Sequence, residues 1–267
     1  FDLQARFPQR LAVRTLGRSV QGRPVYAATV SDPWLPDHDK QHVLVLAGQH
    51  GNEEGGRLIA LALLEWLTCA TDTQAQSVLG RQKIVVIPNA NPDGTEADTP
   101  NTAECVNLNN DHAPTGPMSR EARFIQDAAN ELQPELVTDM HSRGYAGCSH
   151  DMVRYPWTRP YTEDGRLMSA LAEDMAAAGE RAGIPHAVHP LTWPGWWGNI
   201  PADDESHTLS FMYRRFKPLC LWTETAESNE FSVPASLRAA AGMARLRAAL
   251  EWGQRQHSDC CYAGYPV

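Results

Sequence analysis

Short apolar runs alternate with longer amphipathic segments along almost the whole chain, and this alternation restricts the possible folds. Strand-like runs cover residues 42–47, 83–88, 135–141 and 219–225, and residues 14–30 read as a hairpin. Helix-like periodicity covers residues 53–70, 119–132, 161–182 and 234–256. Strands that alternate with helices form sheets covered by helices. We therefore expect an α/β fold in which a mixed, mostly parallel central sheet is flanked by helices.

No linker interrupts the alternation, so residues 1–267 are expected to form a single domain. Of the 267 residues, 42% are hydrophobic and 21% are charged, which supplies an ordinary globular core. The net charge of −9 argues against a nucleic-acid partner, because phosphate binding needs a basic surface. No run approaches the roughly 20 apolar residues that span a bilayer, so no membrane association is expected.

The cysteines and the first residues bear on the compartment. Six scattered cysteines, including the adjacent pair Cys260-Cys261, are too few for a disulfide-rich scaffold. The chain opens with Phe1 and a charged Asp2 and shows no apolar leader there. A cytoplasmic location is the expectation.

Two segments lack strand or helix periodicity and are expected to be loops. Residues 95–118 are polar, and residues 192–213 are rich in Trp and Gly. Loops of this length are uncommon inside compact domains and are often functional.

Three of the expected strands end in side chains that bind metals or transfer protons. The string Gly48-Gln-His-Gly-Asn-Glu53 follows the first strand, Asp139-Met-His141 ends a later one, and Thr223-Glu-Thr225 ends the last. In open α/β sheets, ligands bind beyond the carboxyl ends of the strands. Two imidazoles and one carboxylate leave a position on zinc open for water, and a further carboxylate can accept a proton from that water. Each piece alone is common, but their joint occurrence at strand ends predicts a metal site.

These motifs and several others, in the same order along the chain, resemble the zinc metallocarboxypeptidases of the carboxypeptidase A type. The matching strings are Gly17-Arg-Ser-Val-Gln-Gly-Arg-Pro24, His50-Gly-Asn-Glu53, Asn91-Pro-Asp-Gly94, Asn107-Leu-Asn109, Ser119-Arg-Glu-Ala122, Asp139-Met-His-Ser142 and Thr223-Glu-Thr225.

The resemblance implies one zinc ion bound by His50, Glu53 and His141. It also implies that Glu224 is the general base, which activates the zinc-bound water and passes the proton to the leaving amine. Asp139 precedes His141 by two residues on the same strand face, so it is a candidate to orient that imidazole. An ordinary strand-end carboxylate is the other interpretation of Asp139.

The chain departs from the family where the substrate is held. The usual Asp-Leu-Asn-Arg reads Asn107-Leu-Asn-Asn110, so Asn109 is retained and Asn110 replaces the arginine that binds the substrate carboxylate. A neutral amide lacks the charged planar fork of arginine. A second arginine, which polarises the carbonyl in the family, is absent because residues 95–110 contain no Arg or Lys. Near the position of the family's substrate tyrosine stands Ala202.

Arginines after His141 are candidate replacements, and they are Arg143, Arg154 and Arg159. Arg154 is the preferred one. The predicted substrate-binding residues are therefore Asn109, Asn110 and Arg154. Three tryptophans, Trp193, Trp196 and Trp197, either line a pocket for an apolar or sugar-like group or pack for stability.

Three functions fit these features. The leading interpretation is a zinc-dependent hydrolase that cleaves a C-terminal or γ-linked amide bond of a peptide. An alternative is a deacylase of an N-acyl amino acid, similar to the aspartoacylase and desuccinylase group, which shares the Gly-x-His-Gly-Asn-Glu start. A catalytically silent binding domain is the third, although a silent site would not need Glu224. The expected partner is a peptide or small amide substrate.

Overall fold

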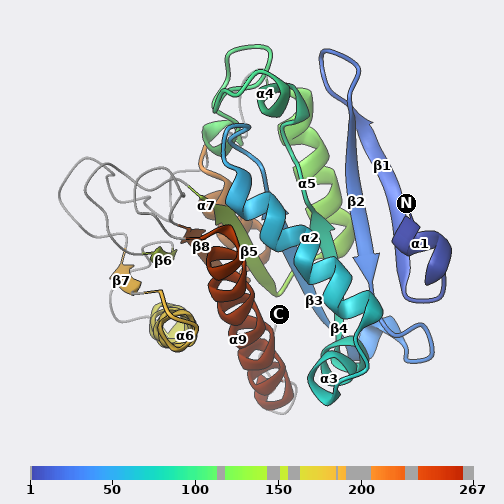
Figure 1. The fold of residues 1–267 in the computed structure, drawn as a ribbon, viewed down its shortest axis with the longest axis vertical. Coiled ribbons are helices and arrows are strands. Elements are labelled where there is room, and N and C mark those ends of the chain that lie inside the picture. Colours follow the sequence, from blue (N-terminus) through green and yellow to red (C-terminus); the bar gives the residue numbers. More distant parts are fainter. Residues whose placement is uncertain are drawn as a thin grey trace.

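The computed structural model describes residues 2–112, 118–142, 151–155, 163–184, 186–190, 206–225 and 234–260. One sheet runs through them, with the strand order β1-β2-β4-β3-β5-β8-β6-β7 (Figure 1). The strands are β1 (Leu11–Arg18), β2 (Pro24–Val30), β3 (Gln41–Ala47), β4 (Gln82–Ile87), β5 (Leu136–His141), β6 (Asp151–Tyr155), β7 (His186–Pro190) and β8 (Leu219–Glu224).

The four central strands, β4, β3, β5 and β8, are parallel to one another. At one side β2 pairs antiparallel with β4 and β1 pairs antiparallel with β2, and at the other side β6 is antiparallel to β8 and parallel to β7. The expected mixed, mostly parallel sheet is therefore confirmed. Residues 43–47 of β3 are all fully buried, as befits a strand covered on both faces.

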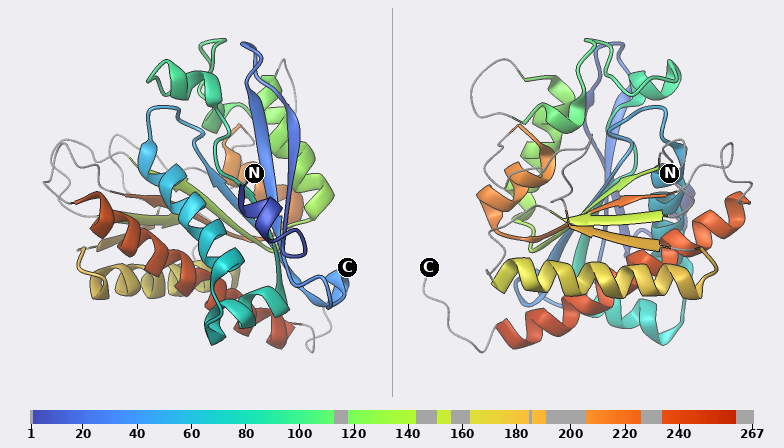
Figure 2. Two further views of the ribbon diagram at one scale, coloured as in Figure 1. Left: turned by 45° about the vertical axis from the view of Figure 1, so that its right-hand side comes forward. Right: turned by 90° about the vertical axis from the view of Figure 1, so that its left-hand side faces the viewer.

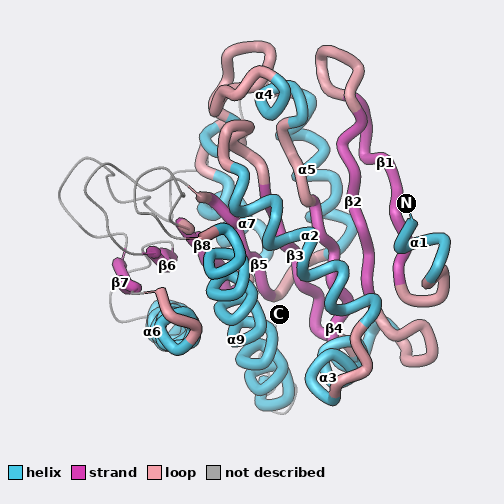
Figure 3. Tube along the Cα trace, in the orientation of Figure 1, coloured by secondary structure: helices cyan, strands magenta, loops and turns pink. Residues whose placement is uncertain are grey.

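Helices cover both faces of this sheet (Figure 2, Figure 3). On one face lie α2 (Glu54–Cys69), α3 (Thr73–Arg81), α6 (Glu163–Arg181) and α9 (Ala235–Cys260). On the other face lie α5 (Arg120–Leu132) and α7 (Thr208–Phe216). Shorter elements are α1 (Asp2–Arg6), α4 (Pro92–Glu96) and the 3-10 turns η1 (Asp37–Asp39) and η2 (Leu108–Asn110). Among the described helices, none combines the length and the apolar character needed to cross a bilayer.

The structure corrects part of one expected loop. Residues 208–213 belong to α7, and residues 192–205 of the Trp- and Gly-rich segment lie outside the described part. The helix forms because Leu209 and Met212 are buried, and because the His207 ring accepts a hydrogen bond from the Leu209 amide at 3.2 Å. The other expected loop, 95–118, is interrupted by the end of α4 and by η2.

Two turn motifs of the sequence meet near the carboxyl ends of the central strands. Asp93 accepts hydrogen bonds from the Ser19 hydroxyl at 2.7 Å and from the Arg23 guanidinium at 2.8 Å. Gly51 lies against Gly94 so closely that an added Cβ would be 2.0 Å from the Gly94 carbonyl carbon. The hairpin therefore holds the Asn-Pro-Asp-Gly string in place, and this string packs against the loop that follows β3.

Candidate metal centre

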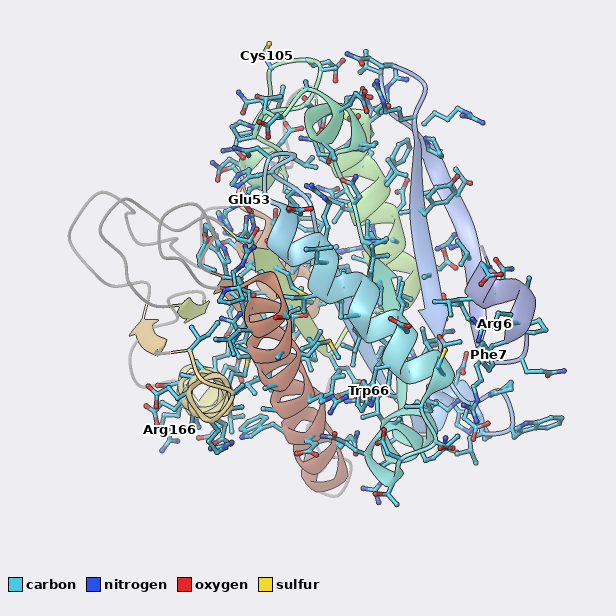
Figure 4. The ribbon with its side chains drawn as sticks, in the orientation of Figure 1. Arg6, Phe7, Glu53, Trp66, Cys105 and Arg166 are labelled. Atoms are coloured by element: carbon cyan, nitrogen blue, oxygen red, sulfur yellow. The ribbon has the colours of Figure 1, made fainter. Side chains whose placement is uncertain are left out.

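Three predicted ligands converge at the carboxyl edge of the sheet. His50 lies in the loop after β3, Glu53 is the residue before α2, and His141 is the last residue of β5. Glu53 Oε1 is 2.8 Å from His50 Nδ1, and Glu53 Oε2 is 2.8 Å from His141 Nδ1. One donor atom from each of the three residues lies within 4.8 Å of the others. Figure 4 shows Glu53 at the N-terminal end of α2.

The start of α2 is built to leave the Glu53 carboxylate available. Glu53 is the N-cap residue, yet its side chain caps no amide of the helix. The Gly55 amide lies in the first turn of α2, where no helix carbonyl can accept from it. It donates instead to the hydroxyl of Ser142, the residue that follows β5, at 2.8 Å. Because Ser142 satisfies this helix donor, the Glu53 carboxylate can face the two imidazoles.

Each ligand imidazole also has a partner on its other nitrogen. His50 Nε2 lies 3.1 Å from Asn107 Oδ1, and the same oxygen accepts a hydrogen bond from the Asn109 amide at 3.1 Å. Since this oxygen is an acceptor, an ion bound at His50 Nδ1 would leave the ring proton on Nε2, where it is donated to Asn107.

His141 is held by a carboxylate rather than by an amide. Its Nε2 is 3.2 Å from Asp139 Oδ2, which also accepts a hydrogen bond from Gln49 Nε2 at 2.6 Å. Asp139 and His141 are both buried. Burial raises the pKa of Asp139. The facing His141 ring and the Gln49 amide lower this pKa by a larger amount, so the net shift is downward.

The same balance applies to the other members of the cluster. Burial raises the pKa of Glu53, but the two imidazoles beside it lower it well below its usual value. Burial lowers the pKa of His141, yet the charges of Asp139 and Glu53 raise it well above its usual value. Without an ion, the two carboxylates therefore favour a proton on His141. A cation there would replace that proton.

The donor chemistry of the cluster fits zinc. Zinc prefers imidazole nitrogen and carboxylate oxygen, and catalytic zinc sites use three protein ligands. His50, Glu53 and His141 supply such a set, and each imidazole has an outer partner of the kind typical of zinc ligands: a hydrogen-bonded amide oxygen for His50 and a facing carboxylate for His141.

The predicted base lies on the neighbouring strand. Glu224 of β8 is in register with His141 of β5, and the Thr225 amide donates to the His141 carbonyl at 3.1 Å. Residues paired in neighbouring strands point to the same face of a sheet, so Glu224 and His141 share one face. Glu224 is almost fully buried, with 4% of its surface exposed.

The predicted substrate residues are placed less uniformly. Asn109 is buried, and its carbonyl accepts a hydrogen bond from the Thr208 hydroxyl at 3.2 Å. Asn110 is exposed at the end of η2. Arg154 lies on β6, where its backbone pairs with Trp222 of β8, and its side chain is outside the described part.

Several other sequence predictions fall outside the described part of the chain. They concern Arg143, Arg159, Trp193, Trp196, Trp197, Ala202 and Cys261. Cys260 is the last residue of α9.

Three polar residues of the site were not assigned a role from the sequence. Gln49 joins Asp139 to Thr208, because its Nε2 donates to the carboxylate and its Oε1 accepts from the hydroxyl at 2.9 Å. Asn107 holds His50, as described above. Gln49 and Asn107 stand inside or beside motif strings, which was the available signal, whereas Thr208 had none.

Comparison with known proteins agrees with this geometry. Residues 2–124 match the sequence model of the zinc carboxypeptidase family. Carboxypeptidase D of Homo sapiens is 27% identical over 138 residues, which are 50% of this chain and 10% of that protein. Probable carboxypeptidase 2 of Arthroderma benhamiae is 33% identical over 106 residues, which are 40% of this chain and 20% of that protein. The chain thus spans a tenth to a fifth of the length of these two relatives.

Solved structures of metallo-carboxypeptidases share the fold. The metallo-carboxypeptidase from Burkholderia cenocepacia superimposes with a TM-score of 0.75 at 23% identity, over 97% of this chain and 67% of that one. Carboxypeptidase A from Helicoverpa armigera superimposes with a TM-score of 0.78 at 17% identity, over 97% of this chain and 71% of that one. Residues 2–124 are therefore similar to the zinc carboxypeptidase family, and the fold is that of the metallo-carboxypeptidases.

Proposed function

We propose that the chain is a zinc-dependent hydrolase that cleaves a C-terminal or γ-linked amide bond of a peptide. The observation that carries this proposal is the arrangement of four side chains at one sheet edge. His50, Glu53 and His141 present donors within 4.8 Å of one another, and Glu224 stands in register with His141 on the next strand.

The residues divide the chemistry among themselves. A bound zinc ion supplies Lewis-acid polarisation of a carbonyl oxygen and lowers the pKa of water to about 7. Glu224 accepts the proton of the attacking water and delivers it to the leaving amine, the role of a general acid–base carboxylate. The buried position of Glu224 limits competing contacts with bulk water.

Recognition of the substrate end is assigned to Asn109, Asn110 and Arg154. Asn110 is exposed beside the site on η2, so its amide is accessible to a substrate. A neutral amide holds a carboxylate weakly, and the charged partner is therefore assigned to Arg154.

Mass spectrometry of a peptide mixture tests the proposal. Each peptide is supplied with a free C-terminus and as its amide, and each is incubated with the zinc-loaded chain with and without a chelator. The proposal expects chelator-sensitive cleavage, confined to the free acids if a carboxylate is recognised. A parallel set contains γ-linked peptides and N-acyl amino acids. Cleavage of N-acyl amino acids alone would favour the deacylase alternative, and no cleavage of any substrate would contradict hydrolase function.

A further inference from the structure

Helix α9 buries a charged residue in the middle of its apolar stripe. Its buried positions recur every three or four residues, as on the inner face of an amphipathic helix, and Arg245 occupies one of them. Only 1% of the Arg245 surface is exposed. Burial of a guanidinium is unfavourable unless hydrogen bonds compensate for the lost water, so its partners indicate why it is there.

Two of its partners within the described residues are on the strand end that carries the predicted base. Arg245 Nη2 donates to Thr225 Oγ1 at 2.7 Å, and Arg245 Nη1 donates to the Glu224 carbonyl oxygen at 3.4 Å. The Thr225 amide in turn donates to the His141 carbonyl. One guanidinium therefore ties α9 to Glu224 and, through Thr225, to the backbone of a metal ligand.

Close packing of two helices places this arginine beneath the site. Gly242 of α9 lies against Ile59 of α2, so that an added Cβ would be 2.1 Å from Ile59 Cδ1. Glu53 stands at the start of α2. The contact brings α9 near the helix that follows Glu53, and the Arg245 side chain reaches from there to the end of β8.

We propose that Arg245 is a positioning residue for the reaction: its guanidinium fixes the backbone at Glu224 and Thr225, and so fixes where the Glu224 carboxylate meets the water and the leaving amine. This role rests on the proposed hydrolase function. Misplacement of a catalytic group by about 1 Å can lower a rate about 100-fold. Because Arg245 lies behind the strand rather than on the substrate, its loss should lower kcat and leave KM nearly unchanged.

The test uses Arg245→Met, Arg245→Lys and Thr225→Val in the full chain. The matched control is Arg247→Met, which removes an arginine of the same helix that stacks over Trp66 at 4.2 Å. Trp66 lies toward the far end of α2 from Glu53 (Figure 4). For each variant we would measure kcat, KM, zinc affinity by chelator competition, thermal stability, and hydrogen exchange in the peptide spanning residues 219–225.

The proposal expects kcat to fall about 10- to 100-fold in Arg245→Met, with KM and zinc affinity within about threefold of the wild-type values. Arg245→Lys should recover part of kcat, because a charged donor is retained. Adding Thr225→Val to Arg245→Met should lower kcat little further, because Arg245→Met has already removed the hydrogen bond between the two side chains. Exchange in residues 219–225 should rise in each of these variants and stay at the wild-type level in Arg247→Met.

Two results would overturn the proposal: a kcat in Arg245→Met equal to that of Arg247→Met, or unchanged exchange in residues 219–225. If Arg245→Met does not fold, Arg245→Lys and Thr225→Val carry the same comparison. If the wild-type chain cleaves no substrate, the proposed function fails, and the exchange measurement still decides whether Arg245 holds this strand end.

Discussion

The metal cluster and the adjoining segment 107–110 are one hydrogen bond apart, between His50 and Asn107, yet they are built differently. In the cluster, His50 and His141 contact Glu53 through one ring nitrogen and an outer partner through the other. In the segment, Asn109 is buried and hydrogen-bonded to Thr208, whereas Asn107 and Asn110 are exposed. The ends of strands thus fix where an ion binds, while substrate recognition depends on side chains that the sheet does not constrain.

Removing a ligand should break the cluster with the largest effect. We expect His141→Ala to lower zinc affinity more than about 100-fold, because a direct ligand contributes more than the outer partners, whose loss costs about 10- to 100-fold. Zinc content after dialysis against a chelator measures this. His38→Ala is the control, since that imidazole is exposed on η1. Full retention of zinc by His141→Ala would contradict the ligand assignment.

Changing the outer partners should weaken the cluster less. We expect Asp139→Asn to lower zinc affinity about 10- to 100-fold, because it removes the charge behind His141. Asn107→Ala should have a smaller effect, since Asn107 is neutral. Chelator competition ranks the two variants, and Asp127→Asn on the exposed side of α5 serves as the control. A larger loss of zinc affinity in Asn107→Ala than in Asp139→Asn would contradict the expectation that the charged outer partner contributes more than the neutral one.

The buried His112, two residues beyond the segment 107–110, should make the free energy of unfolding depend on pH. His112 stacks on Phe211, and burial lowers its pKa from the usual 6.5 to about 4. The unfolded chain therefore binds a proton that the folded chain refuses, and stability is lost as pH falls from 6.5 towards 4.

Between pH 7 and pH 5 this difference amounts to about 2 kcal/mol of unfolding free energy. In His112→Phe that share of the loss should disappear. Urea unfolding of both proteins at the two pH values, under the same chelator, isolates the contribution. An equal loss in the two proteins would show that His112 is not the group responsible.

The smallest effect is expected at the exposed end of the segment. Asn110→Ala should raise KM for free-acid peptides less than about fivefold, because an exposed neutral hydrogen bond contributes about 1 kcal/mol or less. Asn110→Arg should lower KM by adding a charged fork. Steady-state kinetics are measured on free-acid and amide peptides. Only the KM values of the free acids should change in these variants. A response to Asn110→Arg shared by the amides would mean that no carboxylate is bound there.

The sequence predicted the central sheet and the metal cluster because each strand and each motif at a strand end is a local pattern, and parallel strands bring such ends together even where Glu53 and His141 are 88 residues apart. The buried parallel strand β3 contains the continuous apolar run 43–47 and is followed directly by a polar motif, and β5 itself ends in the motif Asp139-Met-His141. His50, Glu53 and His141 stand at those ends, and the structure brings their donors together.

What the sequence did not predict depends on long-range contacts. The hydrogen bond from Gln49 to Thr208 joins residues 159 positions apart, and no local pattern indicates it. The same holds for Arg245, which lies in an Ala- and Arg-rich helix whose other arginines look alike in the sequence. Helix α7 was missed because the Trp- and Gly-rich residues before it suggested a continuing loop.

The most direct test of the account compares the zinc-loaded wild-type chain with Glu224→Gln. Metal content and peptide turnover are measured on the same preparations, using the free-acid peptides that the wild type cleaves. We predict equal zinc in both and a loss of about 100- to 10,000-fold in turnover for Glu224→Gln, because the amide cannot accept the proton of water. Near-normal turnover by Glu224→Gln would contradict the assignment of Glu224 as the base.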